Sequence, residues 1–355
     1  MIIPTVSVDG PEDSDSSHAL SSQIYDALRT AGAFYVRGHG IPQRIVDRCF
    51  AATKAFHSLP AEQRLRLQAR HFGGARGYIP SDMMSDDLDT ESYALNPNAQ
   101  PDKKPRVRRY EAFDVGRAAV SRDGSQLASM VLNDNPWPQI EGFKDSVLDY
   151  FEAMVSLGRT ILSSLCPELG VDSTYFASRT QNPCCTLRLM HYPAGAAPDT
   201  EGIHPHTDFE CLSILTGTAS GLQVLNRQGE WLDVDPPRDS FLVIIGDLLE
   251  VLTNGRLEST LHRVLMSDVE RYSLSFFFGL DYDVVVEPLT PLGGPVPGIY
   301  QPIRSGEHLV AMNVRTFRHL RRRVVLKEIA LPMEVPVENP FIARKLERVR
   351  TERPS

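Results

Sequence analysis

The stretch that decides the fold begins with HTD at 206–208, continues through STLHRV at 259–264 and ends with RYS at 271–273. In an extended strand alternate side chains share a face, so the first and third residues of HTD can point at one centre. The chain between HTD and STLHRV is long enough for several strands to fold back across a sheet. We therefore expect the histidine of STLHRV to reach the same centre.

Those three side chains have the chemistry of a metal site. Two imidazoles and one carboxylate, from His206, His262 and Asp208, form the facial set that holds ferrous iron and leaves coordination positions open. The same set with a water is also a hydrolytic zinc site. Arg271 and Ser273 share a face of the next strand, and a guanidinium fork beside a hydroxyl suits one end of a dicarboxylate. Zinc hydrolysis would not require that pair, so the sequence favours iron.

Three phrases carry a family resemblance. HTD, GDLLEVLTNGRLESTLHRV at 246–264 and RYSLSFFFG at 271–279 resemble the isopenicillin N synthase-like branch of the iron(II)/2-oxoglutarate-dependent dioxygenases. AGAFYVRGHGIP at 31–42 resembles the N-terminal phrase of the same family. The resemblance implies Fe(II), 2-oxoglutarate and O2, and the oxidation, most often hydroxylation, of a small molecule with release of succinate and CO2. It also implies a double-stranded β-helix core.

The resemblance assigns the co-substrate site to three residues. Arg271 would pair with the distal carboxylate of 2-oxoglutarate, and Ser273 would hydrogen-bond it. Tyr192, in LMHYP at 189–193, matches the second tyrosine of the family's Asn-Tyr-Tyr-Pro phrase. The chain departs from that phrase at Met190 and His191, which stand for the Asn and the first Tyr. These departures put one polar contact to the iron-bound end of 2-oxoglutarate in question.

Three further residues, Arg188, Phe209 and Phe277, occupy positions that face the primary substrate in some relatives. Core packing explains the two phenylalanines equally well, whereas Arg188 on a central strand needs either a substrate or a buried partner. A basic loop could also receive an anionic substrate or be a solvated face: Lys103, Lys104, Arg106, Arg108 and Arg109. The basic loop and Arg188 together suggest an anionic or carbonyl-bearing small molecule as the substrate.

The composition excludes several classes of protein. The 355 residues are 42% hydrophobic and 23% charged, as in a soluble globular protein. A net charge of −8 gives no reason to expect nucleic-acid binding, and no apolar run approaches the roughly 20 residues that span a bilayer. The N-terminus lacks the pattern of a secretory signal. Five irregularly spaced cysteines indicate reduced thiols, so we expect a cytoplasmic protein. Oligomeric state is not indicated.

Periodicity predicts an α+β fold in a single catalytic unit, 1–355. Short β-rich runs between Thr186 and Gly279, separated by turn residues, predict a jelly-roll core over 181–290. A mainly helical region with substrate loops, 1–180, and a helical extension, 291–355, would buttress it. Helices are expected at 17–30, 44–67 with a break at Pro60, 142–165, 306–323 and 343–353.

Three alternative functions remain open from the sequence. An iron oxidase of the same fold could take its electrons from the substrate without 2-oxoglutarate, in which case no succinate would form. A zinc hydrolase would be exposed by metal analysis. A jelly roll without catalysis could bind a ligand, because fold does not fix function.

Overall fold

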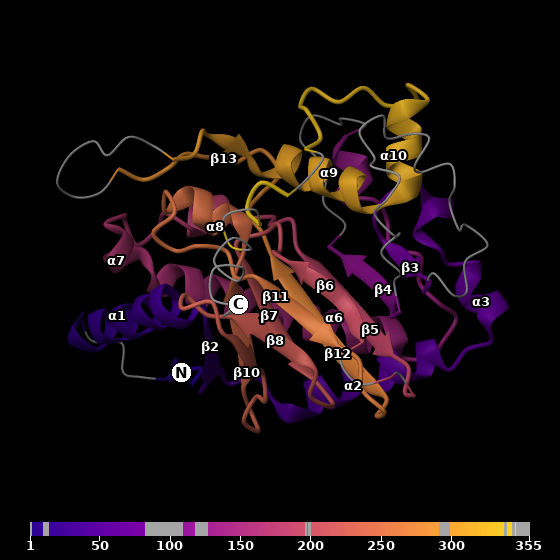
Figure 1. Ribbon diagram of the computed structural model, residues 1–355, viewed down its shortest axis with the longest axis horizontal. Coiled ribbons are helices and arrows are strands. Elements are labelled where there is room, and N and C mark those ends of the chain that lie inside the picture. The colour runs from indigo at the N-terminus through magenta and orange to yellow at the C-terminus, as the bar shows by residue number, and fades with distance from the viewer. Residues whose placement is uncertain are drawn as a thin grey trace, which may run out of the picture.

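A computed structural model of the chain describes residues 2–9, 14–81, 109–117, 127–195, 197, 200–290, 299–336, 339–342 and 345. Two β-sheets face each other and helices surround them (Figure 1). The helices, including the 3-10 turns η1 and η2, are α1 Ser14–Ala31, α2 Gln43–His57, α3 Ala61–Leu65, η1 Ala69–Phe72, α5 Ala128–Val131, α6 Phe143–Ser164, α7 Cys166–Leu169, η2 Ala177–Arg179, α8 Asp247–Leu252, α9 Ser305–Thr316 and α10 Arg318–Val325.

The strands belong to a large sheet, a small sheet and one short pair. Their bounds are β1 Thr5–Ser7, β2 Ala33–Arg37, β3 Gly77–Ile79, β4 Glu111–Gly116, β5 Thr186–Tyr192, β6 Glu201–His206, β7 Leu212–Gly217, β8 Leu222–Leu225, β9 Trp231–Asp233, β10 Phe241–Ile245, β11 His262–Leu265, β12 Arg271–Phe278, β13 Val285–Val286 and β14 Ile303–Arg304. The large sheet has the order β1-β2-β10-β7-β12-β5-β4-β3, and the small sheet β6-β11-β8-β9. This is the jelly-roll core that the sequence predicts.

The large sheet draws strands from both parts of the chain. β1 to β4 precede residue 181. Two of them pair with strands of the expected core, β2 with β10 and β4 with β5, while β1 pairs with β2 and β3 with β4. The region 1–180 therefore completes the sheet as well as supporting it with helices. A three-residue strand such as β3 is too short for its side-chain alternation to stand out in the sequence.

Helices α1, α2 and α6 cover the outer face of the large sheet, and their apolar side chains share one core with that face. A Cβ at Gly158 of α6 would lie 2.5 Å from the ring of Phe278 on β12. Glycine there lets the helix approach the strand closely. A second core fills the space between the two sheets, and it includes Met190, Tyr192, Leu215 and Val264. The inner face of the large sheet is therefore where a site can form.

Most of the predicted helices are present, with one correction. The predicted break near Pro60 falls between α2 and α3, and the predicted helix over 142–165 is α6. The single helix predicted over 306–323 is wrong, because Phe317 is extended between α9 and α10. The Phe317 ring is buried in the second core, which also includes residues of α9 and α10, and the turn at this residue lets Leu320 be buried as well.

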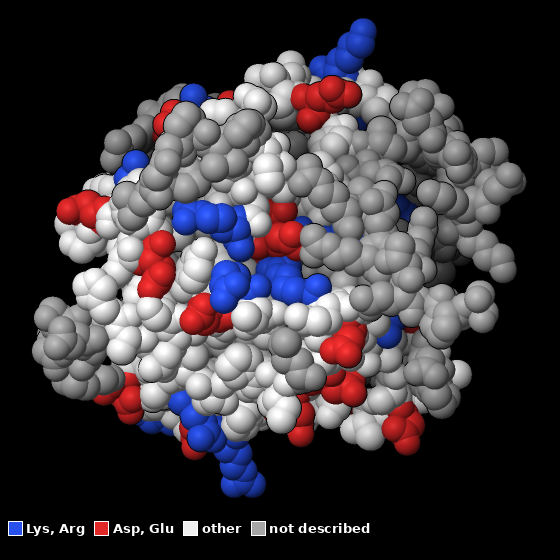
Figure 2. Space-filling view, turned by 60° about the vertical axis from the view of Figure 1, so that its left-hand side comes forward, with Lys and Arg blue, Asp and Glu red and all other residues white. Residues whose placement is uncertain are grey.

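The remaining expectations concern the termini, membranes and thiols. Of the helix expected over 343–353 only Lys345 lies within the described residues. No helix in the described part of the chain is long and apolar enough to cross a membrane. All five cysteines are buried and free. On the face in Figure 2, the basic side chains near the centre have acidic ones directly beside them.

Candidate active site

The three predicted metal ligands meet between the two sheets. His206 ends β6, His262 begins β11, and the two residues are direct cross-strand partners. Their ring centroids lie 4.1 Å apart. Asp208 follows β6 in a loop rather than extending the strand, yet its Oδ1 lies 3.8 Å from Nε2 of His206 and its Oδ2 3.6 Å from Nε2 of His262. One ligand atom from each residue lies within 4.8 Å of the others.

Backbone carbonyls fix both imidazoles in the form that can bind a metal. Nδ1 of His206 lies 2.9 Å from the His204 carbonyl oxygen, and Nδ1 of His262 lies 2.9 Å from that of Thr260. A carbonyl can only accept a hydrogen bond, so each Nδ1 carries the proton and each Nε2 keeps its lone pair. Ligating histidines usually have such a partner on the second ring nitrogen. The two Nε2 lone pairs are therefore available to iron.

The carboxylate is held by the large sheet. Ser213, on β7, donates a hydrogen bond from its hydroxyl to Oδ2 of Asp208. The Asp208 carbonyl accepts the backbone N–H of Asp247 at the start of α8, at 2.9 Å. The side chains of Asp208 and His262 are each 6% exposed, whereas that of His206 is 33% exposed. The site is thus open at His206 and closed on the Asp208 side.

Arg271 and Ser273 lie side by side on the inner face of β12, as predicted. Nε of Arg271 donates to the Ala219 carbonyl at 2.9 Å, and Nη2 lies 3.4 Å from the Ser273 hydroxyl. Nη1 is buried and has no hydrogen-bond partner among the described residues. An unpaired donor on a buried guanidinium is costly. It fits an anion, such as a carboxylate of 2-oxoglutarate, as the missing partner.

Two neighbours shape the space around the guanidinium. Tyr192 is the cross-strand partner of Arg271, whose guanidinium carbon lies 4.8 Å from the tyrosine ring centroid. Burial raises the pKa of Tyr192 to about 12, so its hydroxyl stays a donor at neutral pH. A Cβ at Gly217 would lie 2.9 Å from Nη2 of Arg271. Glycine at that position leaves room for the fork.

Met190 and His191, the two departures from the family phrase, face opposite ways. Met190 shares the inner face with Tyr192, and its sulfur lies 3.5 Å from the hydroxyls of Tyr192 and Ser275. Sulfur accepts hydrogen bonds weakly and cannot donate one, so Met190 cannot supply the amide contact of an asparagine. His191 lies on the outer face, where its ring stacks on Tyr272.

Arg188, one of the predicted substrate residues, has a partner that the sequence did not reveal. Its Nε and Nη2 form a bidentate pair with the Asp114 carboxylate on β4, at 2.8 and 2.7 Å. Burial alone would lower the pKa of Arg188, but Asp114 raises it above the ordinary value. The partner was hidden because Asp114 lies on a strand from the N-terminal region. The pair meets the requirement for a buried partner without a substrate.

The Asp114–Arg188 pair gives a prediction about stability. Asp114→Ala removes the carboxylate and leaves a guanidinium that is 20% exposed without its partner. Breaking such a pair should lower the free energy of unfolding by about 3 kcal/mol. This is the lower end of the range for buried pairs, because Arg188 keeps some exposure. Urea unfolding measures the loss. The double variant Asp114→Ala, Arg188→Met should recover most of the loss, and equal stability of the single variant and the wild type would contradict a structural role.

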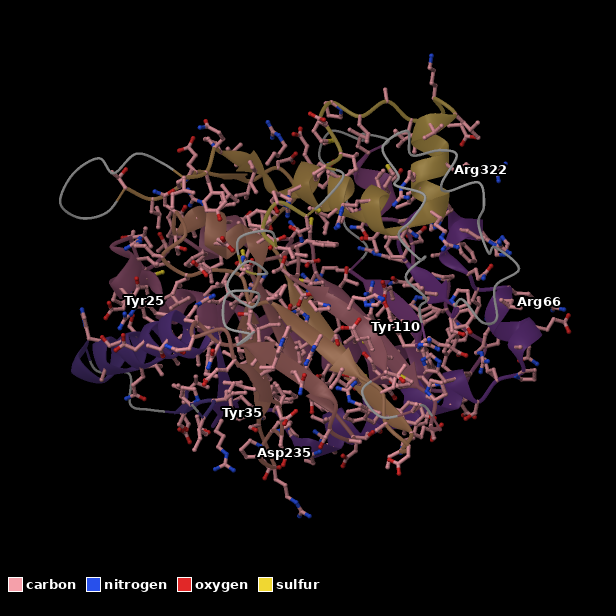
Figure 3. The ribbon with its side chains drawn as sticks, viewed as in Figure 1. Tyr25, Tyr35, Arg66, Tyr110, Asp235 and Arg322 are labelled. Atoms are coloured by element: carbon pink, nitrogen blue, oxygen red, sulfur yellow. The ribbon has the colours of Figure 1, made fainter. Side chains whose placement is uncertain are left out.

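The other predicted substrate residues, Phe277 and Phe209, lie close to Arg188 and to Asp208 respectively. Phe277 lies on the inner face of β12, with the Arg188 guanidinium carbon 5.5 Å from its ring centroid. Phe209 follows Asp208 and is only half-buried. Tyr110, labelled in Figure 3, has its ring 5.7 Å from that of Tyr192. Of the predicted basic loop only Arg109 lies within the described residues.

The C-terminal part of the chain contacts the site at a residue that no sequence pattern indicated. Nδ2 of Asn339 donates to the hydroxyl of Thr207, between the two ligands of HTD, at 2.9 Å. Lys345 is buried, and its ammonium lies 2.7 Å from Oε2 of Glu250 on α8. These contacts span 132 and 95 residues, and no local pattern marks them. Asn339 therefore supports the loop that carries Asp208, and Lys345 supports α8.

Comparison with known proteins identifies the family of the chain. Residues 183–280 match the model of the 2OG-Fe(II) oxygenase superfamily, and residues 3–139 match that of the non-haem dioxygenase in morphine synthesis N-terminal region. The chain is 31% identical to the 2-oxoglutarate-dependent dioxygenase citB of Monascus ruber, over 79% of this chain and 84% of that one. It is 30% identical to a homoarginine-6-hydroxylase of Arabidopsis thaliana, over 81% and 87%.

A solved structure shares the fold. The crystal structure of a full-length Neurospora crassa protein in complex with alpha-KG superposes with a TM-score of 0.73 at 23% identity, over 88% of this chain and 96% of that one. The chain belongs to the 2OG-Fe(II) oxygenase superfamily. It is a 2-oxoglutarate-dependent dioxygenase that uses Fe(II), 2-oxoglutarate and O2.

Proposed function

We propose that this dioxygenase hydroxylates a small molecule at an iron ion held by His206, Asp208 and His262. The observation that carries the proposal is the convergence of two free Nε2 atoms and one carboxylate beside an arginine with an unpaired buried nitrogen. When bound there, Fe(II) supplies activation of O2 coupled to decarboxylation of 2-oxoglutarate, which releases succinate and CO2.

The residues of the chain bind and orient the reactants. Nη1 of Arg271 pairs with the distal carboxylate of 2-oxoglutarate, and the hydroxyls of Ser273 and Tyr192 add hydrogen bonds to it. The Ser213 hydrogen bond holds the Asp208 carboxylate in one orientation. Because Met190 offers no amide, the other end of 2-oxoglutarate depends more on the metal than in relatives with an asparagine.

Arg188, Phe209 and Phe277 form the proposed substrate surface. The Asp114 carboxylate offsets the charge of Arg188, while Nη1 and one N–H of Nη2 remain as donors. That neutral pair suits a carbonyl or another polar acceptor better than a net negative charge. The ring of Phe277 beside it favours a substrate with an apolar or planar part.

Succinate release tests the proposal. The enzyme is incubated with Fe(II), 2-oxoglutarate and O2 against a panel of small carbonyl-bearing compounds, and succinate is compared with hydroxylated product. We expect one succinate for each hydroxylated product. Substrate oxidation with no succinate would instead support the oxidase of the same fold, and turnover that zinc supports and iron does not would support a hydrolase.

A further inference from the structure

A second cluster of two histidines and a carboxylate lies on the outer face of the large sheet. His57 is the last residue of α2, Glu111 is the first of β4, and His191 lies on β5. Glu111 and His191 are cross-strand partners. One ligand atom from each of the three lies within 4.8 Å of the others, and all three side chains are at most 14% exposed.

This outer cluster is separate from the active site. Side chains alternate along β5, so Met190 and Tyr192 face the space between the sheets while His191 faces the helices. His191 contacts His57 of α2, with ring centroids 5.3 Å apart, and stacks on Tyr272. No residue of the outer cluster has a place in the proposed iron, co-substrate or substrate sites.

The hydrogen bonds of His57 leave a lone pair facing a carboxylate. Its Nε2 lies 3.2 Å from the Leu189 carbonyl oxygen, which can only accept, so Nε2 carries a proton. In the neutral ring Nδ1 then has a lone pair, and it lies 3.4 Å from Oε2 of Glu111. Two acceptors that face each other need a cation or a proton between them.

His191 also has one ring nitrogen that is held by an acceptor outside the cluster. Its Nε2 lies 2.9 Å from Oε1 of Glu270, whereas its Nδ1 is buried and has no hydrogen-bond partner among the described residues. A carboxylate or backbone carbonyl on the second ring nitrogen is the usual partner of a metal-ligating histidine. Both histidines of the outer cluster have one, as do His206 and His262 in the active site.

We propose that His57, Glu111 and His191 bind a divalent transition-metal ion, with zinc the favoured ion. Zinc takes imidazole nitrogen and carboxylate oxygen ligands and accepts four-coordinate sites completed by water. Nδ1 of His57, Nδ1 of His191 and one oxygen of Glu111 are the ligands. Arg64, whose guanidinium lies 3.6 Å from Oε2 of Glu111, orients the carboxylate from the outside. The ion joins the end of α2 to β4 and β5.

Metal content in a chain without its iron site tests the proposal. The His206→Ala, Asp208→Ala double variant is freed of metal with a chelator and titrated with zinc against a chromophoric zinc chelator. We expect one zinc ion per chain and a rise in Tm on zinc addition. Since this background cannot hold iron, the result does not depend on the proposed function. No zinc uptake by this variant would overturn the proposal.

Ligand variants in the same background locate the ion. Glu111→Gln keeps the shape of the side chain, and His57→Phe removes one imidazole. Each should weaken zinc binding more than about 100-fold, which exceeds the usual effect of changing a residue that only hydrogen-bonds a ligand. His319→Phe is the matched control, because His319 is another histidine with a backbone-carbonyl partner, at Gly74. It should keep one zinc ion. Unchanged zinc affinity in Glu111→Gln would show that the zinc ion binds elsewhere, and it would overturn the proposal.

Discussion

We expect replacement of Asp208 by alanine to abolish iron-dependent turnover and leave the fold intact. In the proposed iron site this side chain supplies the carboxylate, which lies within 3.8 Å of both histidine Nε2 atoms. Changing a residue that hydrogen-bonds a metal ligand typically lowers metal affinity or activity about 10–100-fold. Loss of a ligand itself should therefore reduce turnover below about 1% of the wild-type rate. The fold survives because the Asp208 backbone carbonyl still accepts the N–H of Asp247. Succinate release and circular dichroism measure the two outcomes.

Ser213→Ala is the graded companion of that variant. It removes the hydroxyl that donates to Oδ2 of Asp208 but keeps all three ligands. Iron affinity should fall about 10–100-fold, and excess Fe(II) should restore turnover. Asp208→Ala should not be rescued by iron at any concentration. Asp208 would not be a ligand if excess iron restored the activity of Asp208→Ala, or if this variant were fully active without added excess iron.

We expect replacement of Arg271 by alanine mainly to weaken the binding of 2-oxoglutarate. Its Nη1 is the buried donor without a partner, and the ring of Tyr192 and the hydroxyl of Ser273 lie beside the guanidinium. A lost charge-assisted hydrogen bond costs about 1.5–3 kcal/mol, so the Kd for 2-oxoglutarate should rise roughly 10–150-fold. Arg271→Lys keeps the charge but loses the forked guanidinium. Its Kd for 2-oxoglutarate should lie between those of the wild type and Arg271→Ala. Calorimetric titration under anaerobic conditions measures the Kd.

Arg263→Ala is the matched control for Arg271. Arg263 follows His262 on β11, so its side chain faces away from the metal site. On that opposite face the guanidinium carbon lies 4.2 Å from the ring centroid of Trp231. The Kd for 2-oxoglutarate should not change in this variant. If Arg271→Ala bound 2-oxoglutarate as tightly as the wild type, the co-substrate assignment would be wrong.

The parts of the molecule that the sequence predicted depend on short-range patterns. Alternation along β12 places Arg271 and Ser273 on one face, and HTD places His206 and Asp208 close together. Asp208 nevertheless lies beyond the end of β6, so a loop, not strand periodicity, directs its carboxylate. The strands of the jelly-roll core and most of the surrounding helices were likewise predicted from the spacing of apolar residues.

The parts that the sequence did not predict depend on long-range contacts. Asp114 pairs with Arg188 because β4 joins β5, and nothing in the local sequence of β4 announces that neighbour. Asn339 reaches Thr207 through the docking of the C-terminal segment. The break at Phe317 involves neither proline nor glycine, and it coincides with the burial of the Phe317 ring in the second core.

The most direct test of the account is an anaerobic titration of the metal-free protein with Fe(II) and then 2-oxoglutarate. The signal is the weak visible absorption band that 2-oxoglutarate gives when it chelates Fe(II). We expect the band in the wild-type protein, no band in His206→Ala, and a band at higher 2-oxoglutarate concentration in Arg271→Ala. Iron binding without a band, or an unchanged band in His206→Ala, would contradict the assignment of the site.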